Sequence, residues 1–249
     1  MTTEAERPVE ERLMQVLQHL GLPRVHIAAR LASDWGGLAT AHPETIASLT
    51  LVCPTGMEAH MLRSLAPRLL VFTGDQGAPA EAVQKVMATL PEATLINLRD
   101  YFSHPRADIL VDRTEEVGVP MLAFLARIAH GQALRTVSVP TDEGEVAGIS
   151  YRVRGAGPPL LLLPLGLAAS QWEPLLPRLS QRYCTITLGG AALGSVASLE
   201  ARGQATGYLG VVRSVIEEAH LQPGETVLDV GCGSGVLDRW LARRTGGAN

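Results

Sequence analysis

The sequence predicts an α/β protein of three layers, in which helices cover both faces of one mostly parallel sheet of about eight strands. Two observations carry this prediction. Short apolar runs alternate along the chain with segments of helical spacing, and most of these runs lack the alternation of half-exposed strands, as expected for strands buried on both faces. Hydrophobic residues make up 46% and charged residues 18% of the 249 residues, which excludes a disordered chain.

The first half of the chain follows a polar tail at residues 1–8. The helix expected next has apolar residues three and four positions apart and ends before Gly21, which is a favourable residue after a helix. His42-Pro43 ends the second expected helix, because proline cannot continue one. The expected helices are 9–20, 30–41, 57–65, 79–89 and 114–129, and the expected strands are 24–29, 48–53, 69–73 and 93–98.

A polar, turn-rich stretch at residues 138–148 indicates an internal boundary, after which the pattern begins again. Residues 189–203 are rich in Gly, Ala and Ser and are expected to form a loop or linker. The remaining expected strands are 147–154, 159–163, 184–188 and 226–230, and the remaining helices are a short one after Trp172 and those at 205–221 and 236–244.

Composition and charge limit the partners of this chain. The net charge is −4 and the basic residues are scattered, so no nucleic-acid-binding face is evident. The longest apolar run, around residues 160–163, is far short of a membrane span. Three widely spaced cysteines suit a reducing cytoplasm, and the histidines lack metal-ligand spacing, so no metal is expected. A small-molecule substrate and a homo-oligomer both stay open.

The most specific motif is the run TVLDVGCGSGVLDRWLARR at residues 226–244, a strand that leads through three glycines directly into a helix. Glycine lets the backbone turn sharply and lets a ligand approach, and a new helix offers free N–H groups. The run resembles motif I of class I S-adenosylmethionine-dependent methyltransferases. The resemblance implies that the glycine backbone contacts the methionine part of S-adenosylmethionine and that Asp229 orders the loop or binds the amino group. The implied cofactor-binding residues are Asp229, Gly231, Cys232, Gly233, Ser234 and Gly235.

Two other interpretations of this run were weighed. It can be an ordinary strand-to-helix turn in which Asp229 is a buried, hydrogen-bonded acid. A nucleophile elbow is excluded, because the residue at its apex would be Gly233, which has no side chain. In a Rossmann-like site an acid about 20 residues beyond the glycines binds the ribose, whereas 14 residues follow Gly235. We therefore expect either a piece of a longer protein or a motif reused without catalysis, with weak or absent cofactor binding.

The rest of the chain resembles an α/β-hydrolase with its halves in permuted order. Residues 9–130, including GGLATAHPETIASLTLVCP and RLLVFTGDQG, are similar to the C-terminal half of that family. Residues 147–188, which begin ISYRVRGAGPPLLLLPLG, are similar to its N-terminal half. The resemblance implies a hydrolase-like sheet whose elbow lies at residues 27–31.

The catalytic positions of this resemblance are mostly lost. Ala29 stands where the nucleophile is expected, so no catalytic residue is assigned and ester hydrolysis is not expected. Asp75 is the one carboxylate near the expected acid, and His104 matches the late histidine as a weak catalytic candidate. Pro164, Leu165 and Gly166 replace the usual His-Gly of the oxyanion hole. A displaced dyad of Ser33-Asp34 with His104 is not expected, because Ser33 falls inside the helix one turn past the elbow. Asp108, Asp112 and Arg113 are expected to form a capping and ion-pair cluster.

Together these observations predict a tail at 1–8, hydrolase-like halves at 9–137 and 138–200, and an incomplete methyltransferase domain at 201–249. The expected function is the N-terminal part of a methyltransferase, with a degenerate hydrolase-like region for recruitment or assembly. The alternative is a hydrolase-fold binding or scaffold protein without catalysis. The strand at 226–230 either joins the hydrolase-like sheet or begins a separate domain.

Overall fold

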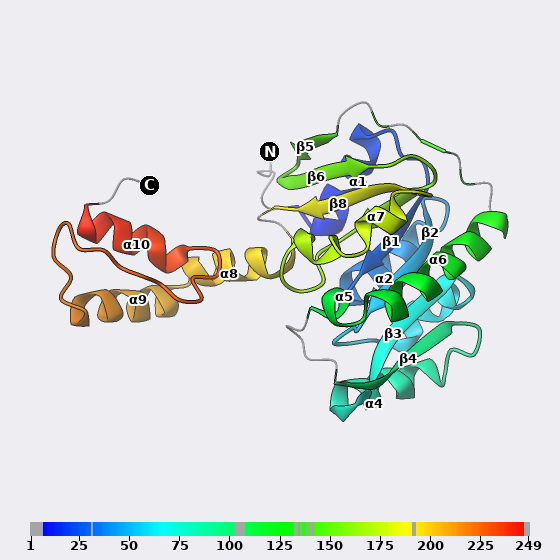
Figure 1. Cartoon of the computed structure of the whole chain (residues 1–249), viewed down its shortest axis with the longest axis horizontal. Coiled ribbons are helices and arrows are strands. Elements are labelled where there is room, and N and C mark those ends of the chain that lie inside the picture. Colours follow the sequence, from blue (N-terminus) through cyan, green and yellow to red (C-terminus); the bar gives the residue numbers. More distant parts are fainter. Residues whose placement is uncertain are drawn as a thin grey trace. The chain divides into compact units, whose positions relative to one another are not determined.

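The computed structural model describes residues 7–30, 32–102, 108–131, 134, 136–137, 139, 142–190 and 193–246, without the side chains of 32–34 and 194–198. The chain divides into two compact units, Met1–Gly194 and Ser195–Asn249. The first unit holds a sheet with helices on both faces, and the second consists of helices and loops (Figure 1). None of the described helices is long and apolar enough to cross a membrane.

One eight-stranded sheet forms the first unit, in the order β4-β3-β2-β1-β7-β8-β6-β5. Its strands are parallel except at one end, where β6 runs antiparallel to both β5 and β8. The prediction of an α/β chain with a mostly parallel sheet is therefore confirmed. The strands are β1 Val25–Ala29, β2 Ile46–Val52, β3 Leu69–Gln76, β4 Thr94–Phe102, β5 Glu143–Val146, β6 Ile149–Arg154, β7 Pro159–Leu162 and β8 Cys184–Gly189.

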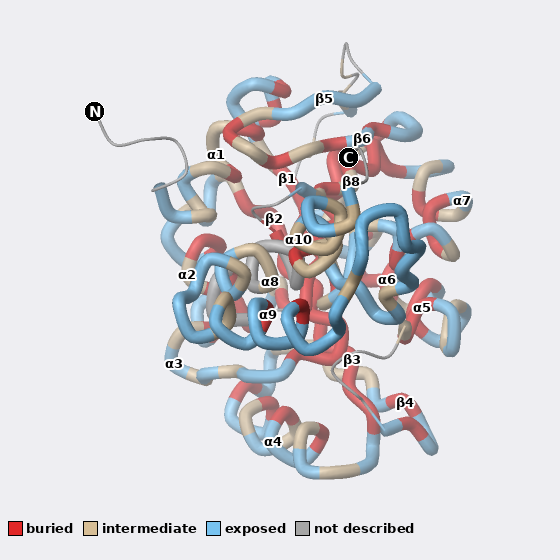
Figure 2. Tube along the Cα trace, turned by 90° about the vertical axis from the view of Figure 1, so that its left-hand side faces the viewer, coloured by how far each residue is buried: buried red, intermediate tan, exposed pale blue. Residues whose placement is uncertain are grey.

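The centre of the sheet is buried on both faces, which explains its continuous apolar sequence. All residues of β1 and β2 are buried (Figure 2). Ile27 of β1 is aligned with Leu49 of β2 on one side and with Leu161 of β7 on the other. The strand that carries the expected elbow therefore lies in the middle of the sheet.

Two separate apolar cores lie against the two faces of the sheet. Residues of α1, α2 and α4 belong to the core that includes Ile27. Residues of α5, α6 and α7 belong to the core that includes Ala28, since successive residues of a strand point to opposite faces. The helices of this unit are α1 Val9–His19, α2 Ala32–Ala41, α3 Ala59–Leu62, α4 Gly77–Met87, α5 Ile109–Asp112, α6 Thr114–Gly131 and α7 Leu176–Leu179, with short 3₁₀ helices η2 Arg63–Arg68 and η3 Ala169–Trp172.

Two expectations about irregular segments are wrong. The turn-rich stretch 138–148 contains β5, a short edge strand that pairs with β6. Its glutamates are exposed, so its sequence is polar and lacks the apolar pattern that predicts a strand. The segment 189–203, expected as a loop, contains most of α8, Gly194–Gln204. The glycine and serine content suggested a loop, but the segment also contains alanine, Leu199 and Glu200, which have high helix propensity.

The second unit lacks the expected strand at residues 226–230. The described part of this unit contains α8, α9 Thr206–Glu218 and α10 Val236–Thr245, and residues 225–229 have no regular structure. Leu228 and Val230 are each 86% exposed, because no neighbouring strand covers them. The alternative in which 226–230 joins the hydrolase-like sheet is therefore wrong.

Candidate functional site

A strand, a turn and a helix occur where the elbow is expected. β1 ends at Ala29 and α2 begins at Ala32. The Ala29 side chain is fully buried and carries no atom able to attack a carbonyl. Residue 31 and the side chains of Ser33 and Asp34 lie outside the described residues, so the displaced dyad stays untested.

The crevice at the centre of the sheet is the place where open α/β sheets bind ligands. From β1 the chain crosses through α2 to β2 on one side, and from β7 it crosses through η3 and α7 to β8 on the other. The loops after β1 and β7 therefore diverge at this point, at the carboxyl ends of the strands. A catalytic residue of the hydrolase-like region would lie here.

Arg30 joins these two loops. Its guanidinium Nη1 donates a hydrogen bond of 2.9 Å to the carbonyl oxygen of Leu165, and only 3% of the residue is exposed. Burial lowers the pKa of Arg30, while its charge interactions with Cys53 and Tyr101 oppose that shift. Sequence reasoning missed Arg30, although a single arginine directly after the apolar run VHIAA was the available signal.

Several groups in and beside the segment expected to replace the oxyanion hole are bound by other groups of the protein. The Leu165 carbonyl accepts from Arg30, and the backbone N–H of Leu167 donates to Oε1 of Gln171 at 2.9 Å. The Trp172 indole N–H donates to the carbonyl of Leu163 at 2.7 Å. Backbone groups of this loop therefore stabilise the protein itself.

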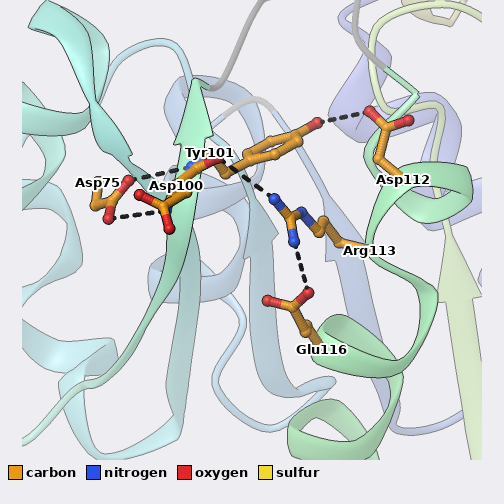
Figure 3. A network of polar contacts seen from close by, with 6 residues as sticks. All are labelled: Asp75, Asp100, Tyr101, Asp112, Arg113 and Glu116. Carbon is orange, nitrogen blue, oxygen red and sulfur yellow. Dashed lines mark hydrogen bonds and ion pairs between the residues drawn. The ribbon is translucent and has the colours of Figure 1, made fainter.

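Asp75, the expected acid, is also engaged by the backbone (Figure 3). Its two carboxylate oxygens accept hydrogen bonds from the N–H groups of Asp100 and Tyr101, at 3.0 and 3.1 Å. These bonds hold the pKa of Asp75 below its ordinary value. Asp75 therefore fastens the end of β3 to the end of β4, and His104 lies outside the described residues.

The Tyr101 side chain extends this network to α5 and α6 (Figure 3). Its hydroxyl donates to Asp112 at 3.2 Å, and burial together with the Asp112 charge raises the pKa of Tyr101 to about 12. Arg113 lies over the Tyr101 ring, 5.4 Å from its centre, and pairs with Glu116 at 3.0 Å. The expected cluster at this helix start exists in part, since Arg113 forms an ion pair, but with Glu116. Asp112 accepts the hydrogen bond from Tyr101 and makes no described ion pair with Arg113.

The glycine loop of the second unit has the predicted turn geometry. Gly231, Gly233 and Gly235 have φ values of 87°, 62° and 74°, a region that side chains other than glycine rarely adopt. Gly235 directly precedes α10. Asp229 is half-buried and Cys232 is exposed, with its thiol 3.9 Å from the carbonyl of Gly233.

Helix α8 packs against this loop, which the sequence did not predict. A Cβ atom on Gly233 would lie 3.2 Å from Cδ1 of Leu199. Glu200 accepts two hydrogen bonds from Nη2 of Arg239, at 3.1 and 2.8 Å, and Arg239 also donates to the Ser234 carbonyl at 3.0 Å. The Ser234 hydroxyl and Arg239 lower the pKa of Glu200. The loop is thus held by protein groups on the side of α8.

Comparisons with known proteins do not assign a family or a function to this chain. No protein-family model matches the chain, and no curated protein matches it. Among the described residues, no three His, Cys, Asp or Glu side chains come together as a metal site requires. The residues around Ala29 and the glycine loop are therefore the two candidate sites of this chain.

Proposed function

We propose that the first unit is a permuted, non-hydrolytic α/β-hydrolase-like module. Strand order supports the permutation. When the chain is followed from β5 to β8 and then rejoined at β1, the sheet contains strands in the order first, second, fourth, third, fifth, sixth, seventh and eighth. Only one neighbouring pair is exchanged, and the antiparallel strand is the second one. The elbow then follows the fifth strand, β1, as the resemblance implies.

The turn after β1 carries the proposal that this module does not hydrolyse esters. A triad needs a nucleophile with a base in reach, and Ala29 supplies no nucleophile. The buried Arg30 is bonded to the carbonyl of Leu165, in the segment that replaces the expected oxyanion hole. A module that keeps the sheet but lacks the nucleophile suits recruitment or assembly.

We further propose that the second unit begins a class I methyltransferase domain. The left-handed glycines leading into α10 support this interpretation, because a glycine turn that ends at a helix N-terminus is the arrangement of a cofactor loop. Bound S-adenosylmethionine would supply an electrophilic methyl group. The described residues do not form a complete site for it, however, since 226–230 is unpaired and Leu199 covers Gly233.

Calorimetric titration of residues 1–249 with S-adenosylmethionine tests whether the described residues form a complete site. We expect weak or no binding, and micromolar affinity would overturn the claim of an incomplete site. The reading frame beyond Asn249 separates the two candidate functions. A further domain of about 150 residues, with an acid at the end of its next strand, would support the methyltransferase.

The second candidate is a hydrolase-fold scaffold whose glycine loop is only a turn. The contacts that α8 makes with the loop favour it, because Leu199 and Glu200 already occupy one side of the glycines. A stop codon after Asn249, together with no cofactor binding, would select this candidate.

A further inference from the structure

A pocket of about 590 Å³ lies at the antiparallel end of the sheet, and its lining does not include Ala29, Arg30 or Leu165. Strands β5, β6 and β8 form its floor, and η3 with the residues that follow it forms its wall. The volume is within the usual range for small-molecule sites. Its lining residues are Glu143, Gly144, Glu145, Ser150, Tyr151, Arg152, Ala169, Ser170, Glu173, Leu176, Thr187 and Gly189.

The floor of the pocket presents two hydroxyl groups. Ser150 is aligned with Gly189, and Thr187 is aligned with Arg152, so all four point to the same face of the sheet. Ser150 and Thr187 are partly buried, and neither hydroxyl has a hydrogen-bond partner among the described residues. Two donor and acceptor groups are therefore available to a ligand.

Gly189 keeps the space above these hydroxyls open. A Cβ atom at this position would lie 3.2 Å from the Ser150 hydroxyl oxygen and 3.6 Å from Cβ of Ala169 on the wall. Any larger side chain would extend into the pocket between floor and wall. The glycine therefore determines the depth of the pocket.

Charged groups at the rim determine which ligands fit. Arg152 pairs with Glu143 at 3.5 Å, and Arg154 pairs with Glu173 at 3.1 Å, so two carboxylates are held in place as acceptors. Glu145 of β5, which is aligned with Ser150 of β6, adds a third carboxylate. Arg152 and Arg154 offset two of the three carboxylates, so the rim keeps an excess of negative charge that disfavours phosphates and other anions. Ligand hydroxyl groups, in contrast, donate strong hydrogen bonds to carboxylates.

We propose that this pocket binds a small, neutral polyhydroxylated molecule of about monosaccharide size. Its hydroxyls donate to the carboxylates of Glu143 and Glu173 and exchange hydrogen bonds with Ser150 and Thr187. Leu176 provides an apolar surface for the carbon skeleton. The site is independent of the proposed methyltransferase function, because every lining residue belongs to the first unit.

Ligand-observed NMR on the full chain tests the proposal with myo-inositol and D-glucose as probes. Both are expected to bind, and D-glucose 6-phosphate is expected to bind more weakly. Thr187→Val keeps the shape but removes one hydroxyl, so it should weaken binding by about threefold to tenfold, and adding Ser150→Ala should weaken it further. Thr89→Val, at an exposed position after α4, is the matched control and should bind as the unchanged chain does.

Three results would overturn the proposal. The first is no binding of either polyol up to about 20 mM, which is weaker than useful recognition. The second is equal binding by the unchanged chain and the Ser150→Ala/Thr187→Val variant. The third is binding of spermidine without binding of either polyol, since that would indicate only attraction to the carboxylates. Circular dichroism of each variant verifies that the fold is intact.

Discussion

The guanidinium of Arg30 donates a hydrogen bond of 2.9 Å to the carbonyl oxygen of Leu165, and thereby joins the loops after β1 and β7. These loops diverge at the point where an open α/β sheet normally binds its ligand. A buried arginine of the protein itself therefore lies at this position, next to a residue, Ala29, that cannot act as a nucleophile.

Arg30→Gln is expected to lower the free energy of unfolding by about 1–3 kcal/mol, because a buried carbonyl loses its charged donor. Urea denaturation at neutral pH measures this free energy of unfolding. Arg63→Gln is the control, since Arg63 is exposed and should change stability little. Equal stability of both variants would show that the link to Leu165 contributes nothing.

Ala29→Ser restores a hydroxyl at the expected elbow, and we expect no esterase activity from it. The position is fully buried, and both oxygens of Asp75 already bind the backbone. The variant should also lose about 1 kcal/mol of stability, because the new hydroxyl is desolvated. Hydrolysis of p-nitrophenyl acetate above the buffer rate would contradict this account of the crevice.

Asp75→Asn should lower the melting temperature at pH 7. The charged carboxylate that accepts from Asp100 and Tyr101 becomes a neutral amide, which offers only one acceptor oxygen. Because these bonds lower the pKa of Asp75, their contribution is present above its ordinary pKa and is lost as the pH falls through the folded-state value. Asp100→Asn, at an exposed side chain on the neighbouring strand β4, is the control, and an equal loss in both variants would exclude a specific role for Asp75.

Stability should fall between pH 6.5 and pH 4 because of His26. This residue is fully buried, its Nδ1 lies 2.7 Å from the Ser48 hydroxyl, and burial together with the Arg24 charge lowers the pKa of His26 to about 4. In that pH range the unfolded chain takes up a proton that the folded chain does not. The expected loss is about 3 kcal/mol at pH 4.

Urea denaturation across this pH range measures the effect of His26. His26→Gln removes the titrating group and should flatten the pH dependence, although it also lowers stability at pH 7. His60→Gln, at a side chain that is 77% exposed, should retain the slope of the unchanged chain. An unchanged slope in His26→Gln would assign the pH dependence to other groups.

Much of the first unit could be predicted from the sequence, because buried parallel strands have a strong apolar signal. β1, β2 and β7 lie at the centre of the sheet and lie within a residue or two of their expected positions. β5 was missed because an edge strand with exposed glutamates lacks that signal. The hydrogen bond from Arg30 to Leu165 spans 135 residues, so no local pattern indicates it.

In the second unit a strand was expected that the described structure does not contain. Residues 226–230 have the sequence of a buried strand, but a strand also needs a partner to satisfy its backbone, and no described strand lies beside them. The turn that follows was predicted correctly, since Gly231, Gly233 and Gly235 adopt the positive φ values for which glycine is suited. Local geometry was therefore easier to predict than pairing.

Labelling with a fluorophosphonate, which modifies activated serine nucleophiles, tests the central claim most directly. The claim is that the proposed hydrolase-like unit does not hydrolyse esters, because Ala29 stands in place of the nucleophile and the buried Arg30 links the two loops beside it. Intact-mass spectrometry of the full chain at pH 7.5 should show no adduct, together with no turnover of p-nitrophenyl acetate above the buffer rate. A stoichiometric adduct on a residue of the first unit, accompanied by ester turnover, would contradict the claim.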